Sequence, residues 1–205
     1  MPTRSSVAIA ESCQVNESTS LILLHQLLFQ GMFFAKNISL RRKLRIPIRG
    51  FNLEANLSIA FFVFFIAVAI YLSLPGNSAI ENSIVPTSMS NLCGVVLMLA
   101  NLAIGWAALK HLGDSWRVGV IEQQTTALVD SGIYRFSRNP FFVAYLLMFA
   151  AYTVLLQSLA LLLLSLLGFG MVHSMVTREE KYLQVVHGSA YSKYKQRVPR
   201  YLGKP

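Results

Sequence analysis

The chain has 205 residues and a net charge of +9, and only 13% of its residues are charged against 54% that are hydrophobic. Soluble domains usually contain about a quarter charged residues, so much of this surface does not face water. Its four scattered histidines and two distant cysteines predict neither a metal site nor a disulfide framework, and its basic residues lack the interleaved exposed aromatics of a nucleic-acid groove.

The first segment in chain order is a polar N-terminal tail, residues 1–19, which we expect to be loosely ordered and which lacks the apolar run of a signal peptide. Five apolar stretches follow, at about 21–38, 57–74, 89–109, 141–156 and 158–176. A helix needs about 20 apolar residues to cross a hydrocarbon core. The sequence therefore predicts an all-α, polytopic membrane bundle of about five transmembrane helices, with an amphipathic C-terminal segment and no Rossmann domain.

Basic residues occur in alternate connecting segments. The basic segments are 36–49, 110–138 and 178–204, and the segments without Lys or Arg are 75–88 and 157–158. Under the positive-inside rule this alternation predicts an external N-terminus and a cytosolic C-terminus. The two longest polar segments, 110–140 and 177–205, then share the cytosolic face, where we expect the active site.

Arg138-Asn139-Pro140 stands where the fourth stretch begins. Proline suits the first helical turn, and Asn139 before it can cap the free backbone N–H groups. A helix N-terminus attracts anions, and Arg138 adds a fixed positive charge. The segment therefore predicts either a carboxylate-binding site or an ordinary capped helix with a snorkelling arginine.

Arg178-Glu179-Glu180 stands at the cytosolic end of the fifth stretch. Adjacent acids beside hydrocarbon are costly, and acids at a helix C-terminus oppose its dipole. They form either a solvated helix end or a carboxylate site for the ammonium of an amino-acid-like ligand. Beyond them, apolar residues at helical spacing, interrupted at Gly188, predict an amphipathic helix pair on the membrane. Gly168 and Gly170 follow no strand, so they indicate close helix packing rather than a dinucleotide site.

Residues 90–205 resemble the isoprenylcysteine carboxyl methyltransferase family, which shares its plan with membrane phospholipid methyltransferases. The matching motifs are Leu112-Gly113-x-x-Trp116, Leu128-Val129-x-x-Gly132-Ile133-Tyr134, Arg138-Asn139-Pro140, Glu179-Glu180 and Gly188-x-x-Tyr191-x-x-Tyr194. Residues 1–88 resemble the family only in being membrane helices. The apolar stretches place three transmembrane helices in residues 20–109, and the resemblance implies that residues 110–205 are a catalytic region with two transmembrane helices and a C-terminal cap.

This resemblance implies a membrane methyltransferase that uses S-adenosyl-L-methionine and acts on a hydrophobic or lipidated acceptor at the cytosolic face. The implied cofactor-binding residues are Leu128, Val129, Gly132, Tyr134, Arg138, Asn139, Pro140, Glu179 and Glu180. Glu179 or Glu180 would bind the cofactor's amino group. The implied partners are membrane lipids and the acceptor, with no nucleic acid and no metal.

The sequence departs from the family pattern at several positions, among them Thr126, where eukaryotic members tend to have a histidine. Asn139 replaces the histidine of the family turn, and Phe142 replaces a tyrosine. Met175 replaces an arginine thought to hold the acceptor's carboxylate, and Arg178 lies close to one helical turn further on. We therefore take Arg178 and Glu179 as the candidate catalytic residues. Three other functions remain open: a phospholipid amine N-methyltransferase, an NADPH-binding membrane reductase with a similar Arg-x-Pro turn, and a non-enzymatic membrane protein.

Overall fold

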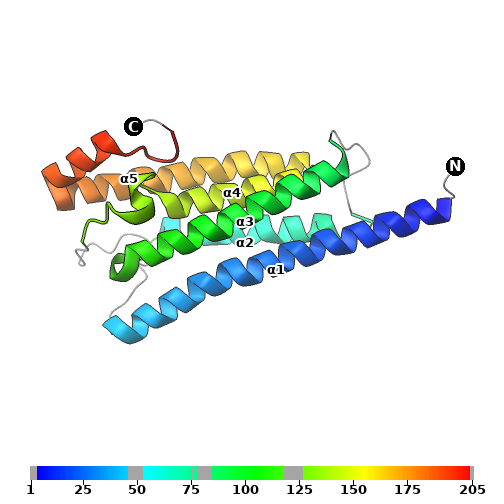
Figure 1. Cartoon of the computed structure of the whole chain (residues 1–205), viewed down its shortest axis with the longest axis horizontal. Helices are drawn as coiled ribbons and strands as arrows, with labels where there is room; N and C mark the ends of the chain where they lie inside the picture. Colours follow the sequence, from blue (N-terminus) through cyan, green and yellow to red (C-terminus); the bar gives the residue numbers. More distant parts are fainter. Residues whose placement is uncertain (1–3, 46–52, 75, 78–84, 118–126, 204–205) are drawn as a thin grey trace.

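The computed structural model describes residues 4–45, 53–74, 76–77, 85–117 and 127–203, and these residues form a bundle of long helices (Figure 1). The helices are α1 Arg4–Leu44, α2 Leu53–Ser73, α3 Thr87–Leu112, α4 Pro140–Leu156 and α5 Leu159–Arg197, with short 3-10 turns η2 Gly113–Ser115 and η3 Gly132–Arg135. The described residues contain no strand. The predicted all-α bundle is confirmed.

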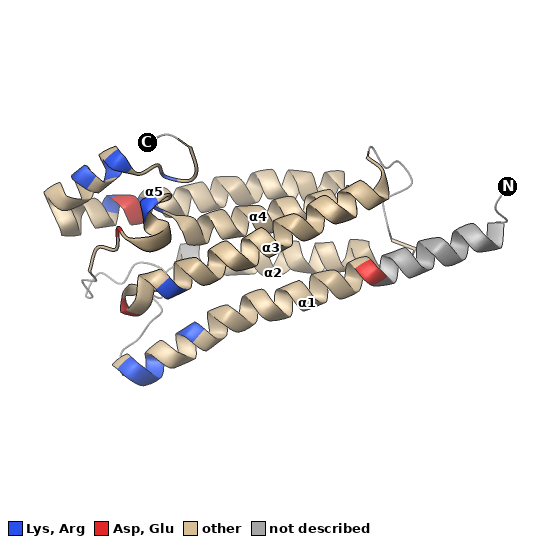
Figure 2. Ribbon diagram, in the orientation of Figure 1, with Lys and Arg blue, Asp and Glu red and all other residues tan. Residues whose placement is uncertain are grey.

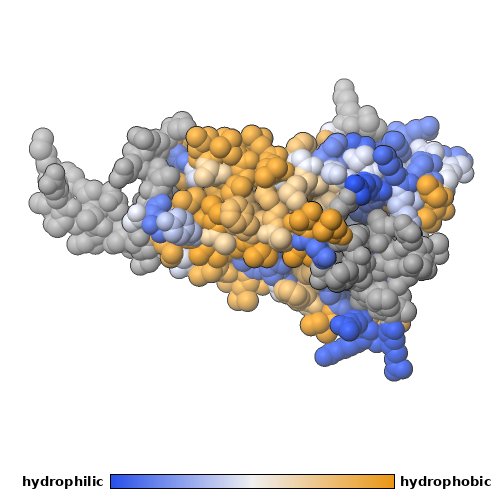
Figure 3. Space-filling model, turned by 180° about the vertical axis from the view of Figure 1, so that it is seen from behind, coloured by the Kyte–Doolittle hydropathy of each residue, from blue (hydrophilic) through white to orange (hydrophobic). Residues whose placement is uncertain are grey.

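Four of these helices, α1, α2, α3 and α5, are long and apolar enough to cross a membrane, and α4 is a shorter apolar helix of 17 residues. Figure 3 shows hydrophobic side chains covering the middle of the bundle, with hydrophilic ones gathered at one end. Large apolar side chains such as Leu27, Leu92 and Leu163 are exposed on this surface. In water such a surface would aggregate, whereas in a bilayer it contacts lipid. The chain is an integral membrane protein.

The first helix begins earlier than the sequence predicts. Residues 4–19 were expected to form a loosely ordered tail, but α1 starts at Arg4 and runs on without interruption into the apolar part. No Gly or Pro occurs between residues 4 and 30. Because nothing in this stretch breaks the helix, it extends outward from the membrane-spanning part.

A buried polar network attaches α1 to α3 and α4. His25 Nε2 donates to Asn101 Oδ1 at 2.9 Å, and the Tyr152 hydroxyl donates to His25 Nδ1 at 2.7 Å. This direction follows because Asn101 Nδ2 is itself donating to the Ala144 carbonyl, at 2.6 Å. Gln26 Nε2 donates to the Tyr152 hydroxyl at 2.7 Å. The polar residues that weaken the first apolar stretch are therefore paired inside the bundle, where hydrocarbon offers no other partner.

The core lies where α4 packs against α3 and α5. It contains Phe149, Tyr152 and Val172, all fully buried. At Gly168 an added Cβ would lie 2.7 Å from Phe149 Cε2, so only glycine lets α5 approach α4 this closely. Gly168 therefore has the packing role expected for it, whereas a Cβ added at Gly170 would meet no other described part of the chain within 4 Å.

The last helix, α5, is longer than a membrane requires. Its apolar part, residues 159–176, would span about 27 Å, so the charged residues that follow lie beyond the hydrocarbon. At Gly188, where φ is 52° and ψ is −121°, the helix breaks and the chain turns back over the end of the bundle (Figure 1). The predicted break at Gly188 is thus present. Lys and Arg residues gather at this same end (Figure 2).

The membrane orientation can be tested by cysteine labelling. On a Cys13→Ser, Cys93→Ser background we expect a cysteine at exposed Lys193 to react with an impermeant maleimide only from the cytosolic side. A cysteine at exposed Ser88, at the start of α3, should react only from the opposite side. Both expectations follow from the charge alternation. If the cysteine at position 193 reacted only from outside, the predicted membrane orientation would be wrong.

Candidate functional site

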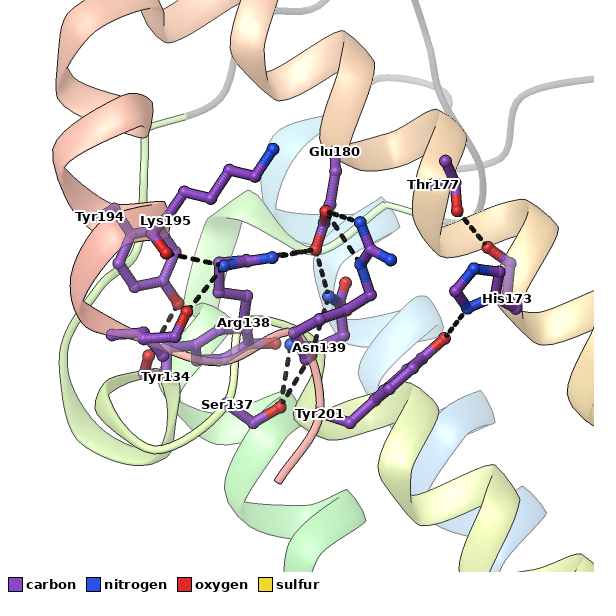
Figure 4. A network of polar contacts seen from close by, with 12 residues as sticks. Tyr134, Ser137, Arg138, Asn139, His173, Thr177, Glu180, Tyr194, Lys195 and Tyr201 are labelled. Carbon is purple, nitrogen blue, oxygen red and sulfur yellow. Dashed lines mark hydrogen bonds and ion pairs between the residues drawn. The ribbon is translucent and has the colours of Figure 1, made fainter. Parts of the chain in front are cut away.

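The candidate site lies where three segments meet beyond the membrane: the turn before α4, the charged part of α5, and the chain after α5 (Figure 4). At its centre is Glu180, whose side chain is 6% exposed. Arg138 and Asn139 approach it from the turn, and Arg200 approaches it from the C-terminal chain. We call these four residues the Glu180 cluster.

Both carboxylate oxygens of Glu180 are occupied. Oε1 accepts from Arg138 Nε at 3.1 Å, Arg138 Nη2 at 3.0 Å and Asn139 Nδ2 at 3.0 Å. Oε2 accepts from Arg200 Nε at 3.1 Å and Arg200 Nη2 at 3.0 Å. The Arg138 side chain is also only 6% exposed, and that of Arg200 is 33% exposed. Two arginines and an amide therefore satisfy both oxygens of one buried carboxylate, and the two guanidinium groups exceed its charge by one.

The turn before α4 is shaped by this cluster rather than by a helix cap. Pro140 occupies the first helical turn, as predicted. Asn139 makes no side-chain capping bond to α4. Its Nδ2 donates to Glu180 Oε1 at 3.0 Å and to the Arg200 carbonyl at 3.1 Å, and these two bonds orient the side chain toward α5 and the C-terminal chain. The predicted capping role of Asn139 is wrong. Its backbone N–H instead donates to the Ser137 hydroxyl at 3.1 Å.

Residues 198–201, which we call the C-terminal strap, lie across this turn. The Arg138 backbone N–H donates to the Pro199 carbonyl at 2.9 Å, and its Nη1 donates to the Val198 carbonyl at 2.7 Å. The Ser137 hydroxyl donates to the Arg200 carbonyl at 3.3 Å. Arg138 thus bonds to the strap through both its backbone and its side chain, so it holds the turn, α5 and the strap together.

The strap also contacts α5 through Tyr201, the residue after Arg200. The Tyr201 hydroxyl lies 3.2 Å from His173 Nδ1, and the Tyr201 ring is inclined against the rings of His173 and Phe169 (Figure 4). His173 is seven residues before Glu180, about two helical turns, so both lie on one face of α5. Arg200 and Tyr201 therefore hold the strap along that face.

The two adjacent glutamates have opposite electrostatic environments. Burial alone would raise the pKa of Glu180, but hydrogen bonds from Arg200 and Arg138 outweigh it and lower the pKa below the ordinary value. Burial and the negative charge of Glu180 raise the pKa of Glu179 to about 7, although part of the Glu179 surface is still accessible. Among the described residues no hydrogen bond reaches the Glu179 carboxylate. Glu179, rather than Glu180, is the carboxylate available to a ligand.

Most of the remaining predicted cofactor residues lie beside the cluster. Tyr134, in η3, is buried, and its carbonyl accepts from the Tyr194 hydroxyl at 2.7 Å. Leu128 packs against Tyr191 and Tyr194. Burial, followed by the charge of Glu179, raises the pKa of Tyr134, which places these two groups near one another. Val129 is half-buried in the chain leading to η3.

Gly132 is required by its backbone and by its neighbour. Its φ is 61°, in the left-handed region that favours glycine. A Cβ at this position would overlap the ring of His111, which α3 presents to η3 and whose Nδ1 donates to the Ala107 carbonyl at 2.7 Å. Glycine thus allows the turn that carries Tyr134 to approach α3.

The candidate catalytic residue Arg178 lies apart from the cluster. It is exposed on α5, whereas Glu180 is buried. Met175, at the position of the family arginine, accepts a hydrogen bond from the Ser58 hydroxyl through its sulfur at 3.0 Å and faces α2. No cationic side chain occupies position 175. A catalytic role for Arg178 stays a prediction.

Sequence reasoning missed Arg200, Tyr191 and Tyr194 as site residues. Arg200 is one of seven basic residues between 178 and 204, and the sequence marks none of them as different. Its partner follows from the chain reversal at Gly188, which brings the strap back onto α5. Tyr191 and Tyr194 stand in one of the motifs of the family resemblance and at the spacing of an amphipathic helix, and neither feature gave them a role at the site.

The family model of phospholipid methyltransferase matches residues 89–190, which is close to half of the chain. No match was found among curated proteins. The matched region includes most of α3, all of α4, and Arg138 and Glu180, and it ends before the strap. The similarity supports a membrane methyltransferase. It does not distinguish carboxyl methyltransferases from phospholipid amine methyltransferases, so the resemblance to the isoprenylcysteine family in particular is not confirmed.

Proposed function

We propose that this chain is an integral membrane methyltransferase that transfers a methyl group from S-adenosylmethionine to the nitrogen of a lipid amine at the membrane surface. The similarity of residues 89–190 to phospholipid methyltransferases carries the reaction class. The accessible carboxylate of Glu179, near the turn before α4, supports S-adenosylmethionine as the cofactor, because it can bind an ammonium group. The neutral side chain of Met175, in place of the family arginine, supports an amine rather than a carboxylate as the acceptor.

The residues beside the Glu180 cluster fit the aminoacyl end of the cofactor. Glu179 is half-buried and has no hydrogen-bond partner among the described residues, so its carboxylate can bind an ammonium group. Arg138 is bound to Glu180 and the strap, so we assign it the task of holding the turn before α4 in place. The cofactor supplies a methyl group on a positively charged sulfur. The protein therefore has to align the acceptor and exclude water.

The acceptor we favour is an amine rather than a carboxylate. A carboxylate near the hydrocarbon boundary requires a cationic partner, and without one it faces a desolvation cost of several kcal/mol. Position 175 provides a thioether bonded to Ser58. Arg178, one helical turn further on, is the cation that could replace the family arginine. A lipid amine needs no such partner, but it attacks the methyl group only as the neutral amine, so its ammonium form must first give a proton to water.

Methyl-transfer assays on purified protein in lipid nanodiscs test this proposal. With labelled S-adenosylmethionine we expect methylation of phosphatidylethanolamine and little or none of a prenylcysteine. Met175→Arg should increase prenylcysteine turnover. Robust prenylcysteine turnover by the wild type, lost in Arg178→Ala, would show instead that Arg178 holds a carboxylate acceptor. Binding of NADPH without S-adenosylmethionine would indicate a reductase, and binding of neither would indicate a non-enzymatic protein.

Glu179 should make cofactor binding depend on pH. Only the deprotonated carboxylate attracts an ammonium group, and burial together with Glu180 raises its pKa to about 7. Between pH 8 and pH 6 the affinity for S-adenosylmethionine should therefore fall about tenfold. Isothermal titration calorimetry measures this dependence. Glu179→Gln should bind weakly and equally at both pH values, and a wild-type affinity that does not change with pH would contradict the assignment.

A further inference from the structure

Two tyrosines on the reversed part of α5 differ in one respect. Tyr191 and Tyr194 are 1% and 2% exposed, their ring centroids are 6.0 Å apart, and together with Val198 they form a buried cluster against which Leu128 packs. The Tyr194 hydroxyl donates to the Tyr134 carbonyl at 2.7 Å. The Tyr191 hydroxyl is buried and, among the described residues, has no hydrogen bond of normal geometry.

A buried hydroxyl without a partner is unusual, because it has given up water and gained nothing in return. Tyr191 is not surrounded by apolar groups alone. Burial raises its pKa, and the charges of Glu180 and Glu179 raise it further, whereas the charge of Arg138 and a hydrogen-bond interaction with its side chain oppose the rise. The hydroxyl is therefore within electrostatic range of Glu180, Glu179 and Arg138.

The contacts around the Tyr191 hydroxyl restrict which kind of group could form a hydrogen bond with it. The Arg138 guanidinium lies close enough to interact with the hydroxyl, but its Nε, Nη1 and Nη2 already donate to Glu180 and to the strap, so no hydrogen bond of normal geometry forms. A ligand group that donates hydrogen bonds could bind the tyrosine oxygen and the Glu179 carboxylate together. An ammonium group has three N–H donors and the charge that the carboxylate requires.

We propose that Tyr191 is a cofactor-binding residue whose hydroxyl, together with the Glu179 carboxylate, binds the ammonium group at the aminoacyl end of S-adenosylmethionine. This inference rests on the proposed function. The amine headgroup of an acceptor lipid has the same chemistry. The cofactor is the better occupant because Tyr191 belongs to a cluster with Tyr194 and the strap residue Val198, against which Leu128 and Leu183 pack. This cluster lies beyond the apolar part of α5 and so away from the acyl region.

The two tyrosines provide matched variants, Tyr191→Phe and Tyr194→Phe. The ligand for calorimetry is S-adenosylhomocysteine, which has the same aminoacyl end and no methyl group to transfer. Tyr191→Phe should bind it about tenfold more weakly, equivalent to about 1.4 kcal/mol. Its thermal midpoint without ligand should be unchanged or higher, because an unpaired hydroxyl has been removed. Tyr194→Phe should lower the midpoint, because the Tyr134 carbonyl loses its donor.

A second ligand separates this inference from the proposed function. 5′-Methylthioadenosine lacks the aminoacyl end, so the wild type and Tyr191→Phe should bind it equally. Unchanged S-adenosylhomocysteine affinity in Tyr191→Phe would overturn the inference. If in addition its KM for phosphatidylethanolamine rose, the hydroxyl would bind the acceptor amine instead. If the wild type bound neither nucleoside, the proposed function would fail, and this inference with it.

Discussion

Glu180→Gln is expected to lower the free energy of unfolding by about 3–5 kcal/mol. The substitution leaves the Arg138 guanidinium buried beside a neutral amide and releases Arg200, so the turn before α4 and the strap lose their common partner. Chemical denaturation in detergent measures the change. Cofactor affinity should fall in Glu180→Gln and in Arg138→Ala alike, because each substitution loosens the turn and the strap that enclose Glu179 and Tyr191.

The pair between Arg197 and Asp130 is a matched control. It also joins the chain after Gly188 to the segment before η3, at 3.5 Å, but its side chains are 67% and 50% exposed. Asp130→Asn should therefore cost less than about 1 kcal/mol. Equal costs for Glu180→Gln and Asp130→Asn would show that the cluster is no more than a surface ion pair. Because the pKa of Glu180 is lowered in the folded protein, its contribution is complete at neutral pH and is lost as the pH falls below its ordinary value of 4.5.

Asn101→Leu is expected to cost about 2 kcal/mol or more. It removes the side-chain acceptor of His25 Nε2 and the side-chain donor to the Ala144 carbonyl, both in the apolar interior. The unfolded chain in a membrane also finds some partners, which keeps the cost of each lost bond toward the lower end of the range. Thermal unfolding in nanodiscs measures the loss. Adding His25→Leu should cost less than the two single changes together, because both remove the same bond.

Asn91, which also lies on α3, provides the control for the predicted effect of Asn101→Leu. Its side-chain oxygen is buried, and among the described residues it has no hydrogen-bond partner. Asn91→Leu should therefore be neutral or stabilising. If Asn91→Leu and Asn101→Leu were equally destabilising, the effect would come from changing asparagine to leucine on α3 and not from the network around His25.

The positions of α2 to α5 follow from the sequence because each is a long apolar run bounded by polar residues or proline. The start of α1 does not follow, since Arg4 to Thr19 are polar yet contain nothing that breaks a helix. His25 makes the first apolar stretch look weak. It is compensated by Asn101 and Tyr152, which lie 76 and 127 residues away in the chain.

The candidate site was predicted in part, since Arg138 and Glu180 were both identified but not as partners of one another. Local sequence cannot reveal a bond between residues 42 positions apart. Asn139 looks like a helix cap from its place before Pro140, yet its amide is used by Glu180. Tyr191 could not be distinguished from Tyr194, because the difference between them lies in whether a carbonyl from η3 faces the hydroxyl.

The strap also determines when the site can form during synthesis. Asn139 and Arg200 are 61 residues apart, and ribosomes add about 5–20 residues per second, so roughly 3–12 s separate the appearance of the turn from that of its last partner. All the apolar helices will by then have been made. A product ending at Arg197 would therefore insert into the bilayer with its full set of spans, but with Arg138 lacking the Val198 and Pro199 carbonyls and Glu180 lacking Arg200. Membrane insertion and completion of the site are separate events in the life of this chain, and a nonsense mutation near its end would separate them permanently.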